Sequence, residues 1–188
     1  MREHAFPHDH DCPMIQDFPI PVLGFAAWSG AGKTTLLTRV IPLLRERGLR
    51  CALLKHAHHM FDIDHPGKDS YALRKAGAEQ VLIASRRRWA LTVEDERDND
   101  PALRDLLSHL DATRADLVLV EGFKGERMPK LEIHRPSVGK PLLYPDDPDI
   151  IAVVSDTPLP TSLTQLDIDD PAAVADFIIA FQRAHTPR

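Results

Sequence analysis

Short runs of consecutive apolar residues alternate along this chain with segments in which apolar residues recur every three or four positions. Uninterrupted runs are typical of buried strands, and the second spacing is typical of helices that bury one face. The alternation of the two patterns predicts strands separated by helices. We therefore expect an α/β fold of three layers, in which a mostly parallel sheet carries helices on both faces.

The clearest strand lies at residues 117–120, where four apolar residues follow one another. Such a run fits a strand that is covered on both faces. A pair of further strands is expected on either side of the basic turn Ser85–Arg88. The complete set of predicted strands is 22–27, 51–55, 81–84, 90–93, 117–120, 131–133 and 150–154.

The first predicted helix covers residues 33–47, whose apolar side chains fall on one face, and Gly48 supplies its end. Pro42 lies inside this helix. Because proline lacks a backbone N–H, we expect it to remove one hydrogen bond and to kink the helix. Three more helices are predicted at 70–76, 101–110 and 171–183.

Composition separates the first residues from the rest of the chain. Residues 1–18 are rich in His, Asp and Pro and have almost no apolar pattern, so we expect a mobile N-terminal extension. Residues 19–188 are then expected to form the folded domain. The full length of 188 residues is sufficient for one domain with a substantial core.

Charge and cysteine content exclude several classes of protein. With 23 basic and 28 acidic side chains the formal net charge is -5, which argues against a nucleic-acid-binding surface. No apolar run is long enough to span a membrane, and the first residues lack the apolar stretch of a secretory signal. Cys12 and Cys51 are too few for a disulfide framework. We therefore expect a cytoplasmic protein that binds neither membrane nor nucleic acid.

The strongest chemical signal is the segment Trp28–Thr35, which lies between the first predicted strand and the first predicted helix. Glycines allow successive backbone N–H groups to face one anion, and the helix N-terminus adds partial positive charge. The segment therefore predicts a phosphate-binding loop, the P-loop or Walker A motif. Ala27 stands where the full motif has its first glycine. The residues predicted to bind phosphate are Ser29, Gly30, Ala31, Gly32, Lys33, Thr34 and Thr35.

Two of these residues have more specific predicted roles, and two further residues join them. Lys33 should reach the terminal phosphates, and the Thr34 hydroxyl should take a Mg²⁺ position. Glu121 follows the strand at 117–120 and could hold Mg²⁺ or orient an attacking water, which makes it the predicted catalytic residue. Gly122 would let the backbone approach a γ-phosphate.

The segment Lys55–Ser70 contains four histidines and allows three interpretations. His56, His58 and Asp62 could ligate a metal ion, although their spacing matches no closed structural zinc site. Alternatively the segment is a switch-like loop over the phosphates, with Lys55 as a phosphate-binding residue. The third interpretation is a polar surface loop.

Three other features have both a functional and an ordinary interpretation. Asp156, just beyond a late strand, could accept hydrogen bonds from the N1 and the exocyclic amine of guanine, or could be a helix cap or a turn residue. The basic turn at residues 86–88 could meet an anionic partner or ligand, although a solvated hairpin turn is the favoured interpretation. The N-terminal residues His4, His8, His10 and Cys12 could store metal, but a solvated tail is the simpler interpretation.

Several strings together resemble the molybdopterin-guanine dinucleotide biosynthesis protein B (MobB) family over about residues 22–180. Members of that family share the alanine at position 27, the proline corresponding to Pro42 and the long segment from Lys-His to Gly-Lys-Asp-Ser. The strings that carry the resemblance are FAAWSGAGKTTLL, LLKHAHHMFDIDHPGKDSYALRKAGA, RRWAL, DLVLVEGFK and IIAVVSDTPL.

The resemblance implies a GTP-binding protein with weak GTPase activity at most, acting mainly as an adapter. It implies a homodimer that assists the guanylyltransferase which joins GMP to molybdopterin and releases pyrophosphate; molybdopterin itself is a further candidate ligand. The implied cofactors are GTP and Mg²⁺. The residues implied for phosphate are Gly30, Gly32, Lys33, Thr34 and Thr35, with Glu121 near the magnesium ion.

Two other functions remain compatible with a phosphate-binding loop. A small-molecule kinase should carry an acceptor-binding carboxylate–arginine pair after its second strand, where this chain has Lys55 and His56. A metallochaperone GTPase would use the histidine-rich N-terminus as its metal store. The chain lacks the Cys-Pro-x-ligand string that such a protein should have between the phosphate loop and Glu121.

Overall fold

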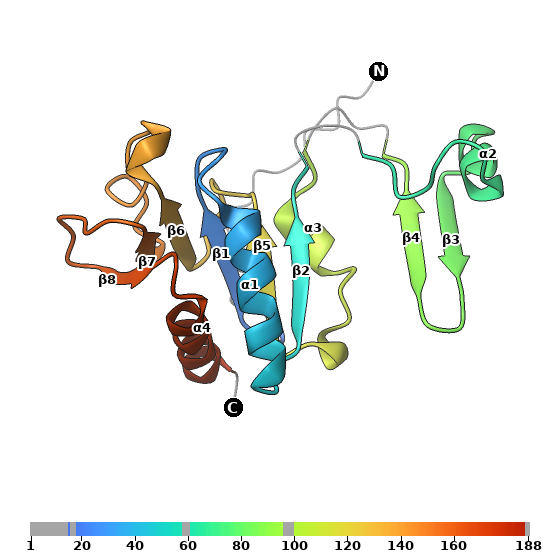
Figure 1. Ribbon diagram of the computed structural model, residues 1–188. Coiled ribbons are helices and arrows are strands. Elements are labelled where there is room, and N and C mark those ends of the chain that lie inside the picture. The colour runs from blue at the N-terminus through green and yellow to red at the C-terminus, as the bar shows by residue number, and fades with distance from the viewer. Residues whose placement is uncertain (1–14, 16–17, 58–60, 96–99, 187–188) are drawn as a thin grey trace, which may run out of the picture. The chain divides into compact units, whose positions relative to one another are not determined.

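The computed structural model describes residues 15, 18–57, 61–95 and 100–186, which form two compact units (Figure 1). The larger unit draws on the segments Met1–His56 and Ala102–Arg188, and the smaller one is Ala57–Pro101. The sequence pattern did not indicate this division. Nearly all of the expected extension, residues 1–18, lies outside the described residues.

The larger unit contains a six-stranded sheet in the order β2-β5-β1-β6-β7-β8, and every neighbouring pair is parallel. The carboxyl ends of the strands therefore lie at one edge of the sheet (Figure 1). The strands are β1 (Val22–Ala26), β2 (Cys51–Lys55), β5 (Leu117–Glu121), β6 (Lys130–His134), β7 (Ile150–Ser155) and β8 (Thr164–Asp167).

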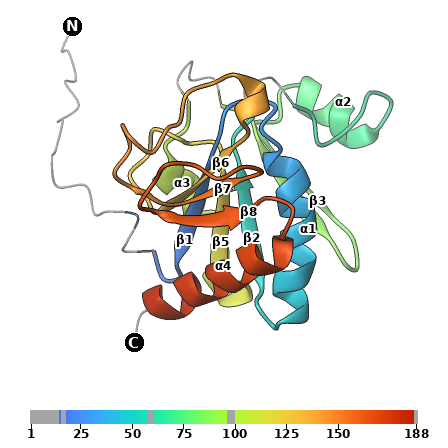
Figure 2. The same ribbon diagram turned by 60° about the vertical axis from the view of Figure 1, so that its left-hand side comes forward.

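Helices cover both faces of this sheet, as predicted. Helices α1 (Lys33–Glu46) and α4 (Pro171–His185) lie side by side on one face (Figures 1 and 2). The short helix α3 (Leu103–Leu107) packs on the opposite face, and two 3₁₀ turns lie at Ala112–Arg114 and Pro136–Val138. The three-layer α/β architecture expected from the sequence is confirmed.

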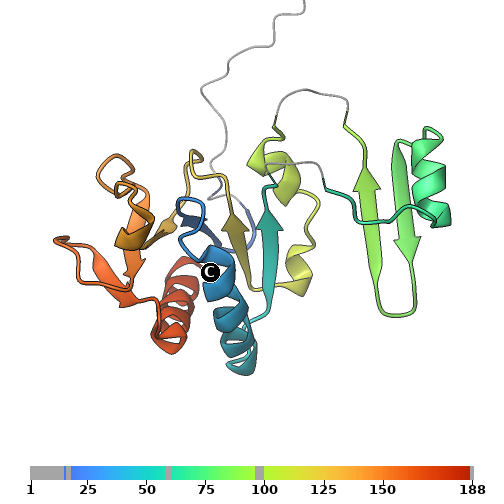
Figure 3. The same cartoon turned by 45° about the horizontal axis from the view of Figure 1, so that its top comes forward.

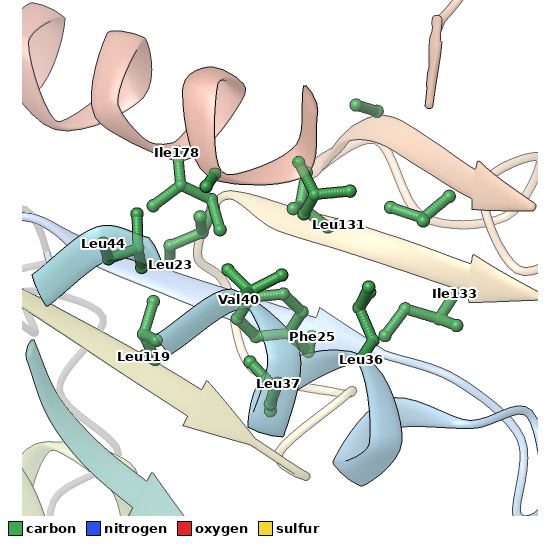
Figure 4. Packing of buried hydrophobic residues seen from close by; sticks show 14 of the residues in the cluster. Leu23, Phe25, Leu36, Leu37, Val40, Leu44, Leu119, Leu131, Ile133 and Ile178 are labelled. Carbon is green, nitrogen blue, oxygen red and sulfur yellow. The ribbon is translucent and has the colours of Figure 1, made fainter. Parts of the chain in front are cut away.

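The main hydrophobic core fills the space between α1, α4 and the sheet. Leu36, Leu37, Val40 and Leu44 project from successive turns of α1 onto the strands, with Ile178 of α4 beside them (Figure 4). The strands contribute Leu23, Phe25, Leu119, Leu131 and Ile133. This packing fixes the N-terminal end of α1 against the carboxyl end of β1, where the phosphate-loop motif lies.

Helix α1 ends at Glu46, within one residue of its predicted boundary, and continues through Pro42, which is exposed. Strand β8 was not predicted, because three of its four residues are exposed and only Leu166 carries an apolar side chain toward the core. An edge strand of this kind has no hydrophobic periodicity to detect.

Strand β6 has one apolar face and one buried polar face. Leu131 and Ile133 enter the main core, while Lys130, Glu132 and His134 alternate on the other side and are all buried. The Lys130 ammonium donates to the carbonyls of Lys124 and Glu126 and lies 2.8 Å from an Asp147 oxygen.

The Glu132 carboxylate accepts from the backbone N–H groups of Leu143 and Tyr144, each at 2.8 Å. Together with Lys130, this residue ties β6 to the loops that follow β5 and precede β7. The buried charges are therefore matched by hydrogen-bond partners, as burial requires.

The smaller unit consists of α2 (Asp69–Lys75) and an antiparallel pair, β3 (Gln80–Ala84) and β4 (Trp89–Val93). Arg74 is buried, and its guanidinium lies 2.6 Å from oxygens of Asp62, Asp64 and Glu94. These carboxylates raise the pKa of Arg74, and the hydrogen bond from Arg74 lowers the pKa of Asp64. This ion-pair network connects three segments of the unit.

Within the described ranges, no helix combines the length and the apolar character needed to cross a membrane.

Candidate functional site

The phosphate-loop motif connects β1 to α1 at the carboxyl edge of the sheet, the edge that comes forward in Figure 3. Gly30 has φ 83° and Gly32, the N-cap of α1, has φ 95°, so both adopt a left-handed conformation that disfavours other residues. Among the described residues no side chain caps α1, and its first turn contains no acidic residue. The N-terminal amides of α1 are therefore suited to an anionic ligand.

Lys33 is the first residue of α1, and its side chain folds back toward the start of the phosphate loop. Its Nζ lies 3.5 Å from the carbonyl oxygen of Ala27. Burial lowers the pKa of Lys33; Glu121 opposes this effect, whereas the charges of Lys55 and Lys124 add to it. Three lysines thus gather at this site in a chain whose net charge is -5. A bound phosphate chain would neutralise this local excess of positive charge.

Thr34, Glu121 and Lys55 meet beside the loop, on the side of β1 that faces β5 and β2. The Thr34 hydroxyl lies 3.3 Å from Glu121 Oε1, and the Lys55 ammonium lies 3.6 Å from Glu121 Oε2. The sheet register explains the meeting, because Glu121 is paired with Lys55 of β2. The Glu121 side chain is only 11% exposed, so little of it faces solvent.

Backbone geometry holds Glu121 at the end of β5. The His56 N–H donates to the Glu121 carbonyl at 2.8 Å, and the rings of His56 and Phe123 lie 4.9 Å apart. Gly122 has φ 100°, and a Cβ there would lie 2.6 Å from the His56 Cβ. Gly122 therefore permits a close approach to His56, the residue that follows β2.

The remaining predicted loop residues face different surroundings. Ser29 and Thr35 are exposed. Ala31 is buried with its side chain in the main core, and its N–H donates to the Trp28 carbonyl at 3.2 Å. Ala31 can therefore offer a ligand only backbone atoms.

Trp28 organises a cationic surface that the sequence pattern did not indicate. Its indole N–H donates to the Pro141 carbonyl at 2.8 Å. The ammonium groups of Lys124 and Lys140 lie 4.4 and 5.7 Å from its ring centroid, within range of cation–π attraction. Contacts between residues so distant along the chain have no signature in local spacing.

Asp156, the predicted guanine reader, follows β7 and forms an ion pair with Arg135, which follows β6. The Arg135 Nη1 lies 2.8 Å from Asp156 Oδ2. Sequence reasoning did not identify Arg135, because nothing in its neighbourhood resembles a known motif.

The histidine-rich segment yields no metal centre in the part of the chain that the structure describes. There, no three His, Cys, Asp or Glu side chains are grouped so as to hold a metal ion. His58 lies outside the described residues, and Asp62 is engaged by Arg74 in the smaller unit. The N-terminal residues His4, His8, His10 and Cys12 also lie outside the described residues. The basic residues 86–88 lie in the exposed turn between β3 and β4.

Residues 22–156 match the family model described as molybdopterin guanine dinucleotide synthesis protein B, MobB. The chain is 48% identical over 165 residues to the molybdopterin-guanine dinucleotide biosynthesis adapter protein of Escherichia coli, covering 87% of this chain and 94% of that protein. Identity to the adapter protein of Haemophilus influenzae is 44% over 160 residues, covering 85% and 88%.

Solved structures of proteins with the same description share the fold. A crystal structure of molybdopterin-guanine biosynthesis protein B (mobB) superposes with a TM-score of 0.66 at 28% identity, covering 85% of this chain and 99% of that one. The crystal structure of Bacillus subtilis MobB gives a TM-score of 0.65 at 25% identity, covering 86% and 97%.

Proposed function

The chain belongs to the molybdopterin guanine dinucleotide synthesis protein B (MobB) family, and from this premise we propose that it is a GTP-binding adapter in the synthesis of molybdopterin guanine dinucleotide. The proposal carries to this chain the adapter role named for its relatives, and adds the nucleotide that the site is suited to bind. Weak GTPase activity at most accompanies this role.

The observation that carries the proposal is the arrangement of Thr34 and Glu121 beside the uncapped N-terminus of α1. Backbone N–H groups and Lys33 would bind the β- and γ-phosphates. A hydroxyl and a carboxylate are hard oxygen ligands of the kind that Mg²⁺ prefers. We assign the magnesium position to Thr34 and Glu121, and a second phosphate-binding role to Lys55.

Slow hydrolysis follows from how Glu121 is engaged. One carboxylate oxygen faces Thr34 and the other faces Lys55. A carboxylate held on both oxygens is better suited to orienting Mg²⁺ and its water than to removing a proton from an attacking water. Bound Mg²⁺ would supply charge stabilisation at the phosphates.

We assign the preference for guanine to Asp156. A carboxylate can accept the hydrogen bonds that guanine donates from N1 and its exocyclic amine, a donor pair that adenine lacks. Its Oδ2 already accepts from Arg135, and a carboxylate has lone pairs for further donors.

The proposed partners are the guanylyltransferase that joins GMP to molybdopterin, molybdopterin itself, and a second copy of this chain. Large apolar side chains exposed on the smaller unit support a homodimer, since a second copy would present the same residues. The most exposed of them on the hairpin are Leu82 at 62%, Trp89 at 58% and Val93 at 50%. We propose the cytoplasm as the compartment, in keeping with the free thiol of Cys51.

Neither alternative function gains support. The family match gives no reason to prefer a small-molecule kinase. The family match likewise gives no reason to prefer a metallochaperone, whose metal store would be the N-terminal histidines.

The test is a calorimetric titration of the purified full chain with GTP and with ATP, each with and without Mg²⁺. We expect GTP to bind more tightly than ATP and Mg²⁺ to strengthen binding. Preference for ATP would overturn the proposed specificity, and binding of neither nucleotide would overturn the proposal as a whole. A pull-down with the guanylyltransferase then tests the adapter role.

A further inference from the structure

Arg135 lies against the phosphate loop, although it is distant from that loop in the sequence. It is the first residue after β6, and β6 is hydrogen-bonded to β1, which leads into the loop. A Cβ placed on Gly32 would be 3.5 Å from Arg135 Nε and 3.9 Å from a methyl carbon of Ile168. The guanidinium is therefore within reach of any nucleotide bound at the N-terminus of α1.

Asp156 holds the Arg135 side chain in this position. Residues His134 and Ser155 are paired across β6 and β7, so the residues that follow them emerge next to each other. The ion pair measures 2.8 Å, and the two side chains are 32% and 24% exposed. The guanidinium is thus restrained yet open to a ligand.

The two sides of β1 differ in a way that orients a nucleotide. Toward β5 and β2 lie Glu121 and Lys55, which suit the metal ion and the terminal phosphate. Toward β6, β7 and β8 lie Arg135, Asp156 and a hollow of about 330 Å³ lined by residues 155–158 and 165–167. A nucleotide whose γ-phosphate lies beside Glu121 and Lys55 therefore extends its base toward Arg135 and Asp156.

We propose that Arg135 is a nucleotide-binding residue whose guanidinium stacks on the face of the purine base, with the edge of the base toward Asp156. This inference rests on the proposed binding of GTP. A planar guanidinium stacks well on aromatic rings. Because Asp156 already balances its charge, Arg135 is a weaker partner for phosphate than Lys33, while its flat face stays available.

The experiment compares Arg135→Ala with Arg47→Ala as a matched control. Arg47 also forms a 2.8 Å ion pair in the larger unit, with Asp176 on the exposed surface of α4. Calorimetry with Mg²⁺ measures affinities for GTP, GDP and tripolyphosphate, which has neither base nor ribose. Loss of base stacking should weaken GTP and GDP binding by about tenfold in Arg135→Ala and leave tripolyphosphate binding unchanged. Arg47→Ala should match the unsubstituted chain with all three ligands.

Three results would contradict the inference or its premise. If Arg135→Ala weakens tripolyphosphate binding as much as GTP binding, Arg135 is a phosphate ligand. If Arg135→Ala leaves GTP and GDP binding unchanged, Arg135 is not part of the site. Either result overturns this inference alone. Failure of the unsubstituted chain to bind any nucleotide would instead overturn the proposed function, and this inference with it. If thermal denaturation shows that Arg135→Ala is not folded, Arg135→Gln is measured in its place. This variant keeps a hydrogen-bond donor for Asp156.

Discussion

Lys33 carries the positive charge nearest to the loop that we assign to the phosphates. Its removal leaves the β- and γ-phosphates without their main cation, so Lys33→Ala should weaken GTP binding by about 100-fold. Equilibrium dialysis with labelled GTP measures this loss. Lys75→Ala, which removes an ammonium beside Tyr71 in the smaller unit, is the control. Normal GTP affinity in Lys33→Ala would exclude the loop as the phosphate site.

Glu121 has a different predicted effect, because its proposed role is to hold the metal ion rather than to bind the phosphates directly. Glu121→Gln keeps the shape and a hydrogen-bond acceptor for Thr34 but removes the charge that Mg²⁺ requires. GTP hydrolysis should fall by about tenfold or more, while affinity for GTP measured without Mg²⁺ stays within about twofold. Phosphate release and calorimetry measure the two quantities. Unchanged hydrolysis would exclude Glu121 from the metal position.

Cys51 provides a prediction that depends on pH. Burial, reinforced by the charge of Asp116, raises the pKa of the Cys51 thiol to about 11. In the Cys12→Ser variant, the rate of alkylation by iodoacetamide should rise with an apparent pKa of about 11 when the chain is folded. In urea the same rate should rise near the ordinary thiol value.

The same shift of the Cys51 pKa affects stability. The unfolded thiol ionises at lower pH than the folded one, so the unfolded state loses its proton first. The contribution of Cys51 to the free energy of unfolding is therefore present below about pH 9 and lost as the pH rises toward 11. Alkylation profiles that coincide in the folded and unfolded chain would contradict the buried environment of Cys51.

The places of the candidate site residues were predictable where a motif fixes them in the backbone. Lys33 and Thr34 follow from the glycine-rich turn before a helix, and Glu121 from its position after a buried strand. Arg135 was not predictable as a candidate, since its proposed role depends on an ion pair with Asp156, which follows the neighbouring strand. Such pairings are set by sheet register, which one sequence does not reveal.

At the scale of elements, the N-terminus of α4 offers a clean test of local stability. The Asp170 carboxylate accepts from the N–H groups of Ala172 and Ala173 at 3.1 and 3.0 Å, and Pro171 occupies the first helical turn. Asp170→Ala should lower the free energy of unfolding by about 1 kcal/mol, because helix donors lose their acceptor.

Urea denaturation measures this change, with Asp169→Ala as the control. Asp169 is the preceding residue, and its carboxylate makes only a 3.7 Å ion pair with Arg39 at the surface. Asp169→Ala should lower the free energy of unfolding by less than about 0.5 kcal/mol. Equal losses in the two variants would mean that the cap does not stabilise α4.

The elements themselves were largely predictable, because the sheet is buried on both faces. Runs such as Leu117–Val120 have no polar interruption, and α1 shows its apolar face clearly. The hydrophobic pattern did not predict strand β8, because this strand is short and mostly exposed. The polar face of β6 could be mistaken for a solvated one, since the partners of Lys130 and Glu132 lie in the loops on either side of the strand and include several backbone groups.

For the whole molecule, the proposed homodimer makes a prediction about the smaller unit. Leu82→Asp together with Trp89→Asp should convert the dimer to a monomer in analytical ultracentrifugation, because charged groups would replace the exposed apolar side chains. Arg87→Asp, in the exposed turn of the same hairpin, should leave the dimer intact. A dimer that persists in the double variant would exclude this hairpin as the contact surface.

The division into two units was the part of the architecture that the sequence did not reveal. Strands β3 and β4 have apolar patterns like those of the main sheet, so the sequence alone predicts that they belong to the same domain. In the structure they pair only with each other, and several of their apolar side chains are exposed. Apolar character alone does not distinguish a side chain buried within the chain from one that a second chain would cover.

The smaller unit is a single uninterrupted stretch of chain, Ala57–Pro101, set between two segments of the larger one. A stretch of this kind can be exchanged between relatives as one gene cassette, and its exchange leaves every residue of the phosphate loop in place. With the proposed dimer contact on this stretch, changes within it would alter assembly, and changes in the larger unit would alter the proposed nucleotide binding. Chimaeras in which residues 57–101 are exchanged with those of a relative would show whether assembly follows the smaller unit while ligand binding follows the larger one.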